Sequence, residues 1–138
     1  MQKVIICIDD APDRYLKFSV DGCLTLVVET LDQYYFYTSN KNLKVVGFCL
    51  DFDMPKTQGN VYAEKIAIEF PDNPVVITSL NVHGANTMQS ILNWNNVRNR
   101  KIPAIDGWEN RANEYFSDHF YERGSQEHQD NVAYISNL

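Results

Sequence analysis

Apolar residues in this chain are gathered into short runs that do not alternate with polar residues. Four such runs span residues 4–8, 23–28, 45–50 and 75–79. A short run of this kind that ends in polar residues is typical of a strand buried on both faces of a sheet. The pattern therefore predicts four buried strands.

Between these runs, the apolar positions follow helical spacing. Thr30 and Gln33 have the spacing of a capping box, which predicts a helix from there to about Tyr37. Further helices are predicted where apolar residues recur at intervals of three and four, around residues 63–70, 88–92 and 108–120. Strands that alternate with such helices predict an α/β fold with a mainly parallel sheet covered on both faces, because each right-handed crossover returns its helix to the sheet.

The segment after the first predicted strand has two interpretations. Pro12 suits the first turn of a short helix that carries Arg14. Residues 16–20 also alternate between apolar and polar side chains, which favours a hairpin that turns at residues 21–22. We favour the helix, because residues 23–28 then form the next parallel strand.

The last third of the chain is less regular. A brief fifth strand is predicted at residues 102–105, where Pro103 interrupts it. Residues 124–130 are predicted to form a loop and residues 132–135 a short terminal element. A chain of 138 residues can bury roughly two thirds of its unfolded surface. We therefore expect one domain, 1–138, with a C-terminal helical extension from about residue 106 to 138.

Charge and cysteine content argue against several classes of function. The chain has 12 basic and 18 acidic residues, a net charge of −6, which disfavours an extended nucleic-acid surface or a membrane-binding surface. No apolar run approaches the ~20 residues of a membrane span. The three cysteines are an odd number, all in apolar runs, and no signal pattern precedes them. We therefore expect a reducing, cytoplasmic location.

Polar residues follow the predicted strand ends: Asp9, Asp10, Asp51, Asp53, Thr78, Ser79 and Asn81. Ligands of open parallel sheets bind outside the carboxyl ends of the strands, so we expect these side chains to form one site. Asp51 and Asp53 would point to the same face if the strand continues through them. Converging carboxylates repel unless they share a cation, and Mg²⁺ prefers oxygen ligands. The sequence thus predicts an Mg²⁺ site, with Asp10 and Asp51 as ligands.

The order of these residues resembles that of receiver domains of two-component signalling, which have an acidic pair, a later aspartate and a Thr or Ser after successive strands. A closer resemblance is to the receiver-like family of cyclic-phosphate-processing domains (cREC). The matching residues are Asp9-Asp10 with Arg14, Asp51-Phe52-Asp53, Gly59, and residues 78–88, which read Thr-Ser-Leu-Asn-Val-His-Gly-Ala-Asn-Thr-Met. The resemblance covers residues 3–92, about two thirds of the chain.

This resemblance implies a flavodoxin-like, receiver-like three-layer sandwich. It also implies metal-assisted or acid-base attack on a cyclic phosphodiester, such as an RNA end or a nucleotide derivative. The catalytic groups would be Asp9, Asp10, Asp51 and Asp53. The phosphate would be bound by Arg14, Thr78, Ser79, Asn81, His83 and Gly84, the glycine because it allows the following helix to present its N-terminal amides to an anion.

One position departs from the family pattern, because Thr78 stands where the family has a histidine. A hydroxyl does not carry a proton near neutral pH as an imidazole does, although His83 lies nearby in the sequence. A catalytically inactive module that binds a nucleotide signal or a protein partner is therefore the main alternative. A phosphoaccepting receiver comes third, with Lys101 before Pro103 as a weak counterpart of a receiver lysine. A haloacid-dehalogenase-like phosphatase comes last.

Overall fold

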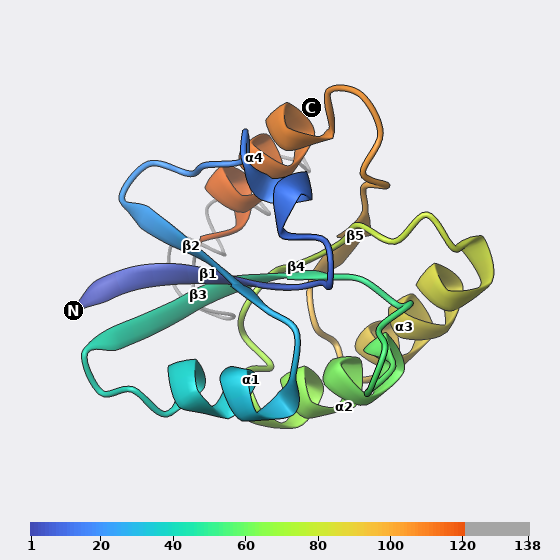
Figure 1. Ribbon diagram of the computed structural model, residues 1–138, viewed down its shortest axis with the longest axis horizontal. Coiled ribbons are helices and arrows are strands. Elements are labelled where there is room, and N and C mark those ends of the chain that lie inside the picture. Colours follow the sequence, from blue (N-terminus) through green and yellow to red (C-terminus); the bar gives the residue numbers. More distant parts are fainter. Residues whose placement is uncertain (121–138) are drawn as a thin grey trace, which may run out of the picture.

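The computed structural model describes residues 1–120, so the predicted loop at 124–130 and terminal element at 132–135 lie outside the described residues. Within residues 1–120, the strands form one parallel sheet in the order β2-β1-β3-β4-β5 (Figure 1). Their bounds are Gln2–Ile8 (β1), Cys23–Val28 (β2), Leu43–Leu50 (β3), Val75–Ile77 (β4) and Asn99–Lys101 (β5). The sheet therefore contains all four predicted buried strands.

Helices cover both faces of this sheet. Three of them, α1 (Leu31–Thr38), α2 (Gly59–Glu69) and α3 (Val82–Trp94), lie on one face. The opposite face carries the 3₁₀ helix η1 (Pro12–Tyr15) and α4 (Trp108–His119) (Figure 1). This arrangement confirms the predicted three-layer, flavodoxin-like fold. None of the described helices combines the length and the apolar character that crossing a membrane requires.

The composition of β1 follows from its central position. Val4, Ile6 and Ile8 contribute to the core beneath α1, α2 and α3. Ile5 and Cys7 point to the other face and pack with η1 and α4. Successive side chains of a strand alternate between the faces, so a strand covered on both sides is apolar at every position.

The segment after β1 forms a short helix, as favoured by the sequence, but its regular part is a single 3₁₀ turn, Pro12–Tyr15. The alternative hairpin is excluded because residues 16–20 form no strand, and β2 pairs instead with β1 in parallel, with Ile8 opposite Val28. Phe18 and Val20 are buried in the core beneath α4 even though they lie in irregular backbone. Their alternation therefore reflects burial of a loop rather than a strand.

The fifth strand exists, but its predicted position at 102–105 is wrong. It comprises Asn99–Lys101, which pair in parallel with Val75–Ile77. Its residues are polar because β5 is an edge strand, with a neighbour on one side only. Ile102 still donates a backbone hydrogen bond to Ile77, at 2.9 Å, but Pro103 has no N–H with which to extend the strand.

Candidate functional site

Two aspartates lie side by side at the carboxyl edge of the sheet because β1 and β3 are neighbours. The register pairs Ile8 with Leu50, so the next residues, Asp9 and Asp51, leave the sheet together. This is also where the strand order reverses, since β2 lies on one side of β1 and β3 on the other. One carboxylate oxygen from each of Asp9, Asp10 and Asp51 lies within 4.8 Å of the other two. We call these three residues the aspartate cluster.

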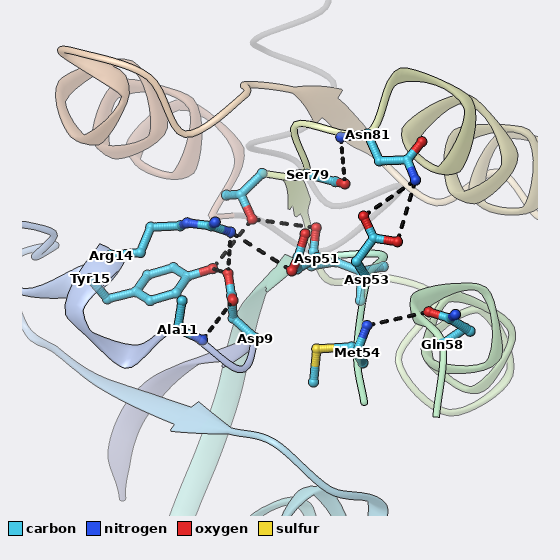
Figure 2. Close-up of polar contacts among 12 residues, drawn as sticks. Asp9, Ala11, Arg14, Tyr15, Asp51, Asp53, Met54, Gln58, Ser79 and Asn81 are labelled. Carbon is cyan, nitrogen blue, oxygen red and sulfur yellow. Dashed lines mark hydrogen bonds and ion pairs between the residues drawn. The ribbon is translucent and has the colours of Figure 1, made fainter. Parts of the chain in front are cut away.

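Asp9 is fully buried and is held by three donors from the segment that follows it. The backbone N–H of Ala11 donates to its Oδ1 at 2.9 Å. Arg14 Nη1 and the Tyr15 hydroxyl both donate to its Oδ2, at 2.7 and 2.8 Å (Figure 2). A buried carboxylate is tolerated only when it is paired in this way. The η1 turn is therefore what keeps Asp9 in place.

Asp51 lies in a less favourable environment than Asp9. Burial, together with the neighbouring charge of Asp9, raises its pKa to about 6. The guanidinium of Arg14 and a hydrogen bond from Ser79 oppose this rise. Arg14 Nη1 is 3.8 Å from Asp51 Oδ2, against 2.7 Å from Asp9 Oδ2. One guanidinium thus serves two carboxylates and pairs closely with Asp9 alone.

Arg14 and Tyr15 differ in the charge they bring to the site. Burial lowers the pKa of Arg14, but the charges of Asp9 and Asp51 outweigh burial and raise it above its ordinary value. Burial raises the pKa of Tyr15, so its hydroxyl keeps its proton and donates a hydrogen bond to Asp9. Arg14 is therefore a permanent cation, whereas Tyr15 is a neutral donor.

Thr78 and Ser79 follow β4 and are both buried. The Thr78 hydroxyl lies 3.3 Å from the Tyr15 hydroxyl and donates to the backbone oxygen of Leu50 at 3.4 Å. Ser79 Oγ accepts a hydrogen bond from the backbone N–H of Asn81 at 3.1 Å. Thr78 is thus part of the structure around Asp9, and Ser79 lies between the aspartate cluster and α3.

Asp53 does not share a face with Asp51, because β3 ends at Leu50 and the alternation of a strand stops there. Its exposed carboxylate instead accepts hydrogen bonds from the side-chain amide of Asn81, at 3.3 Å to each oxygen (Figure 2). Asn81 in turn caps α3, since its Oδ1 accepts from the Gly84 N–H at 2.9 Å. Asp53 and Asn81 therefore form a capping network beside the cluster.

Gly84 and Gly59 are required where two helices start close to the loop after β3. A Cβ on Gly84 would lie 2.3 Å from Cγ of Phe52. A Cβ on Gly59 would lie 2.1 Å from the backbone oxygen of Asp51. The amide of Gly84 is already bonded to Asn81, and His83, in the same turn, is exposed. Packing therefore explains both glycines without a ligand.

Tyr15, in the short helix after the first strand, was not among the site residues predicted from the sequence. Its hydroxyl joins Asp9 to Thr78, yet nothing in the periodicity of residues 12–20 distinguishes it. The sequence did offer one indication, because the Tyr15 hydroxyl comes six residues after Asp9 and directly after Arg14. Lys101 lies at the end of β5, where its ammonium group donates to Asn86 at 2.6 Å, and it makes no ion pair with the cluster among residues 1–120.

The donor set of the aspartate cluster fits Mg²⁺. The ion takes oxygen ligands at about 2.1 Å, so two ligands on opposite sides of it are about 4.2 Å apart. One oxygen from each carboxylate of the cluster lies within 4.8 Å of the other two, and Asp10 is exposed, so its side chain can turn toward an ion without disturbing the core. An ion here would compete with Arg14, because both are cations attracted by Asp9 and Asp51.

Comparison with known proteins supports the fold. No family model and no curated protein sequence matches the chain. Among solved structures, the response regulator TrrA from Thermotoga maritima, in complex with Mg²⁺-BeF, matches with a TM-score of 0.59 at 14% identity, over 85% of this chain and 98% of that one. A Francisella response regulator receiver domain matches with a TM-score of 0.59 at 21% identity, over the same shares of 85% and 98%.

A third match is the phosphorylated cyanobacterial phytochrome response regulator RcpA. Its TM-score is 0.52 at 14% identity, over 99% of this chain and 96% of that one. At such identities, these likenesses establish that the chain has the fold of receiver domains.

Proposed function

We propose that this chain binds a phosphate-containing ligand together with Mg²⁺ at the aspartate cluster. The observation that carries the proposal is the approach of three carboxylates at the point where the strand order reverses. Bound Mg²⁺ would neutralise these carboxylates and attract phosphate oxygens. The presence of Mg²⁺-BeF in TrrA, which shares the fold, supports the choice of ion.

Arg14 is the residue best placed to bind the phosphate. Its side chain is 23% exposed and lies between Asp9 and Asp51. Once the carboxylates are neutralised by another cation, the guanidinium is released to pair with phosphate oxygens, for which its planar fork is well suited. The Ser79 hydroxyl, next to Asp51, is a second donor on the opposite side of the cluster.

We infer further that the ligand is a cyclic phosphate. Support comes from the resemblance of residues 78–88 and of the aspartate motifs to cyclic-phosphate-processing domains. Hydrolysis would require water to attack phosphorus, the bond to one ribose oxygen to break, and that oxygen to receive a proton. Thr78 is engaged with Tyr15 and Leu50, and His83 is exposed. The geometry therefore supports binding more directly than turnover.

The test is a calorimetric titration of the protein with 2′,3′-cyclic nucleotides, in the presence and absence of Mg²⁺. We expect binding that requires Mg²⁺ and is lost in Asp51→Asn, whereas Asp32→Asn, on the exposed start of α1, binds as the wild type does. Binding that does not depend on Mg²⁺, or that persists in Asp51→Asn, would contradict the proposal. Chromatography of the same mixtures decides turnover, since hydrolysis opens the ring to a phosphomonoester.

A second candidate function is phosphate acceptance by Asp51. The position of Asp51 at the end of β3, beside Asp9 and Asp10, favours it, as does the phosphorylated state of RcpA. Against it, the cation next to Asp51 is Arg14 rather than a lysine. Incubation with a small phosphodonor such as acetyl phosphate, followed by mass spectrometry, tests this function. An unchanged mass rules it out for that donor.

A further inference from the structure

A cavity of about 550 Å³ lies beside the aspartate cluster. Its lining comes from η1 and the residues just after it, and from the loop that joins β5 to α4 together with the start of α4. Both segments lie on the face of the sheet that carries α4 (Figure 1). Arg14 lines this cavity and also contacts Asp9 and Asp51. The cavity and the cluster therefore share the side chain of Arg14.

The cavity offers apolar surface that the fold does not use. Leu16 and Ile105, on opposite segments of the lining, are 81% and 58% exposed. Trp108 is different, because it is buried and stacks on Phe18 with ring centroids 5.4 Å apart. It makes a rigid base for the cavity, while Leu16 and Ile105 remain available to an aromatic ring of a ligand.

The polar part of the lining is acidic overall, because Arg14 is engaged with Asp9 and Asp51 and the other charged residues are three carboxylates and one lysine, Lys17. Asp13, Asp106 and Glu109 line the cavity, and within residues 1–120 their carboxylates take part in no ion pair or hydrogen bond. Carboxylates accept hydrogen bonds and repel phosphate. The cavity therefore suits an uncharged group that carries N–H donors and apolar faces, and it disfavours a second phosphate.

We propose that this cavity binds the nucleoside of a mononucleotide whose phosphate is bound at the aspartate cluster, an inference that rests on the proposed function. A base between Leu16 and Ile105 would present its N–H donors to Asp106 or Glu109. Guanine offers two adjacent donors, its ring N–H and its amino group, which match the two oxygens of one carboxylate, whereas uracil offers one. The cavity volume is within the roughly 300–1,000 Å³ of small-molecule sites.

Calorimetry with Mg²⁺ and three probes tests this inference: 2′,3′-cyclic GMP, 2′,3′-cyclic UMP and inorganic phosphate. We expect cyclic GMP to bind about tenfold more tightly than cyclic UMP, and inorganic phosphate to bind most weakly. Ile105→Ala should weaken cyclic GMP binding about tenfold and leave phosphate binding unchanged. Asp106→Asn combined with Glu109→Gln should abolish the preference for guanosine.

Matched controls are Ile68→Ala and Glu64→Gln, both exposed on α2, on the other face of the sheet. Neither should change the binding of cyclic GMP.

A short RNA that ends in guanosine 2′,3′-cyclic phosphate should bind more weakly than cyclic GMP, because its additional phosphate meets the acidic lining. Tighter binding would contradict a mononucleotide ligand. Equal affinity for cyclic GMP and inorganic phosphate would contradict nucleoside binding in the cavity, without contradicting phosphate binding at the aspartate cluster. Cyclic GMP binding that is lost in Ile105→Ala but unchanged in Asp51→Asn would contradict the proposed function and leave the nucleoside cavity standing.

Discussion

Asp9 and Asp51 show how two identical side chains at neighbouring strand ends acquire different roles. Asp9 accepts hydrogen bonds from Ala11, Arg14 and Tyr15, so its charge is compensated by the protein. Asp51 has a guanidinium nitrogen at 3.8 Å and a pKa raised to about 6. Its charge is poorly compensated, which is the condition in which a carboxylate gains most from an external cation.

Asp51→Asn should therefore stabilise the ligand-free protein at about pH 8. The pKa of Asp51 in the folded protein, about 6, is above its ordinary value of 3.8, so ionisation of this group opposes folding. The penalty is complete above the folded pKa and disappears as the pH falls toward the unfolded value. Thermal unfolding without Mg²⁺ should show a higher Tm for the variant at about pH 8 and a shrinking difference toward about pH 4. A lower Tm at pH 8 would contradict this interpretation.

Tyr15→Phe should destabilise the protein by about 2 kcal/mol, because a buried carboxylate loses one of its donors. The matched control is Tyr62→Phe, since the buried Tyr62 hydroxyl has no hydrogen-bond partner within residues 1–120. That change should be neutral or stabilising. Urea unfolding of both variants measures the free energies, and equal losses would show that the Tyr15 hydroxyl contributes nothing specific to Asp9.

At the scale of elements, the site depends on how closely α2 and α3 approach the loop after β3. The first residue of α2, Gly59, donates its N–H to the backbone oxygen of Phe52 at 2.9 Å. In the first turn of α3, Gly84 packs against the ring of Phe52. The two glycines thus pack against the loop from both helices. Gly59 lies against the backbone of the loop, whereas Gly84 lies against the side chain of Phe52.

This difference predicts different responses to substitution. Gly84→Ala should cost about 1–3 kcal/mol through overpacking, and so should Gly59→Ala. Phe52→Ala should recover part of the loss in Gly84→Ala, because it removes the ring that the new methyl group meets and leaves only the Cβ of residue 52 close to it. It should recover none in Gly59→Ala, where the obstacle is the Asp51 backbone oxygen. Double-mutant cycles of unfolding free energy measure both couplings, and equal couplings would contradict the packing described.

At the scale of the whole molecule, ligand binding and folding stability are linked through the cluster. An ion that binds only the folded state, at a free concentration of about 100 times its Kd, adds about 2.7 kcal/mol to the free energy of unfolding. Protons compete with the ion for Asp51, so the affinity for Mg²⁺ should fall as the pH drops through about 6. The Mg²⁺-induced rise in Tm should thus be larger at about pH 8 than at about pH 5. Asp51→Asn should show little rise at either pH, and a rise equal to that of the wild type would contradict Asp51 as a ligand.

The architecture was largely predictable from local pattern. Runs that are apolar at every position occur where a strand is covered on both faces, and the capping box at Thr30 marks a helix start that the structure confirms, with Thr30 Oγ1 accepting from the Gln33 N–H at 3.2 Å. The edge strand was misplaced because β5 buries little and so leaves no apolar pattern. Apolar periodicity indicates which residues are buried, so it does not reveal a strand that buries few side chains.

The sequence by itself determined that acidic residues end β1 and β3 and that these ends lie at one edge of a parallel sheet, because burial follows from local composition and the carboxyl ends of parallel strands share one edge. Only the tertiary structure decided that Asp51 joins Asp9 and Asp10, that Asp53 turns to Asn81, and that Tyr15 and Arg14 hold Asp9. Such choices depend on where a strand ends to within one residue and on distances between segments far apart in the chain. Those distances arise from packing, which no local pattern records.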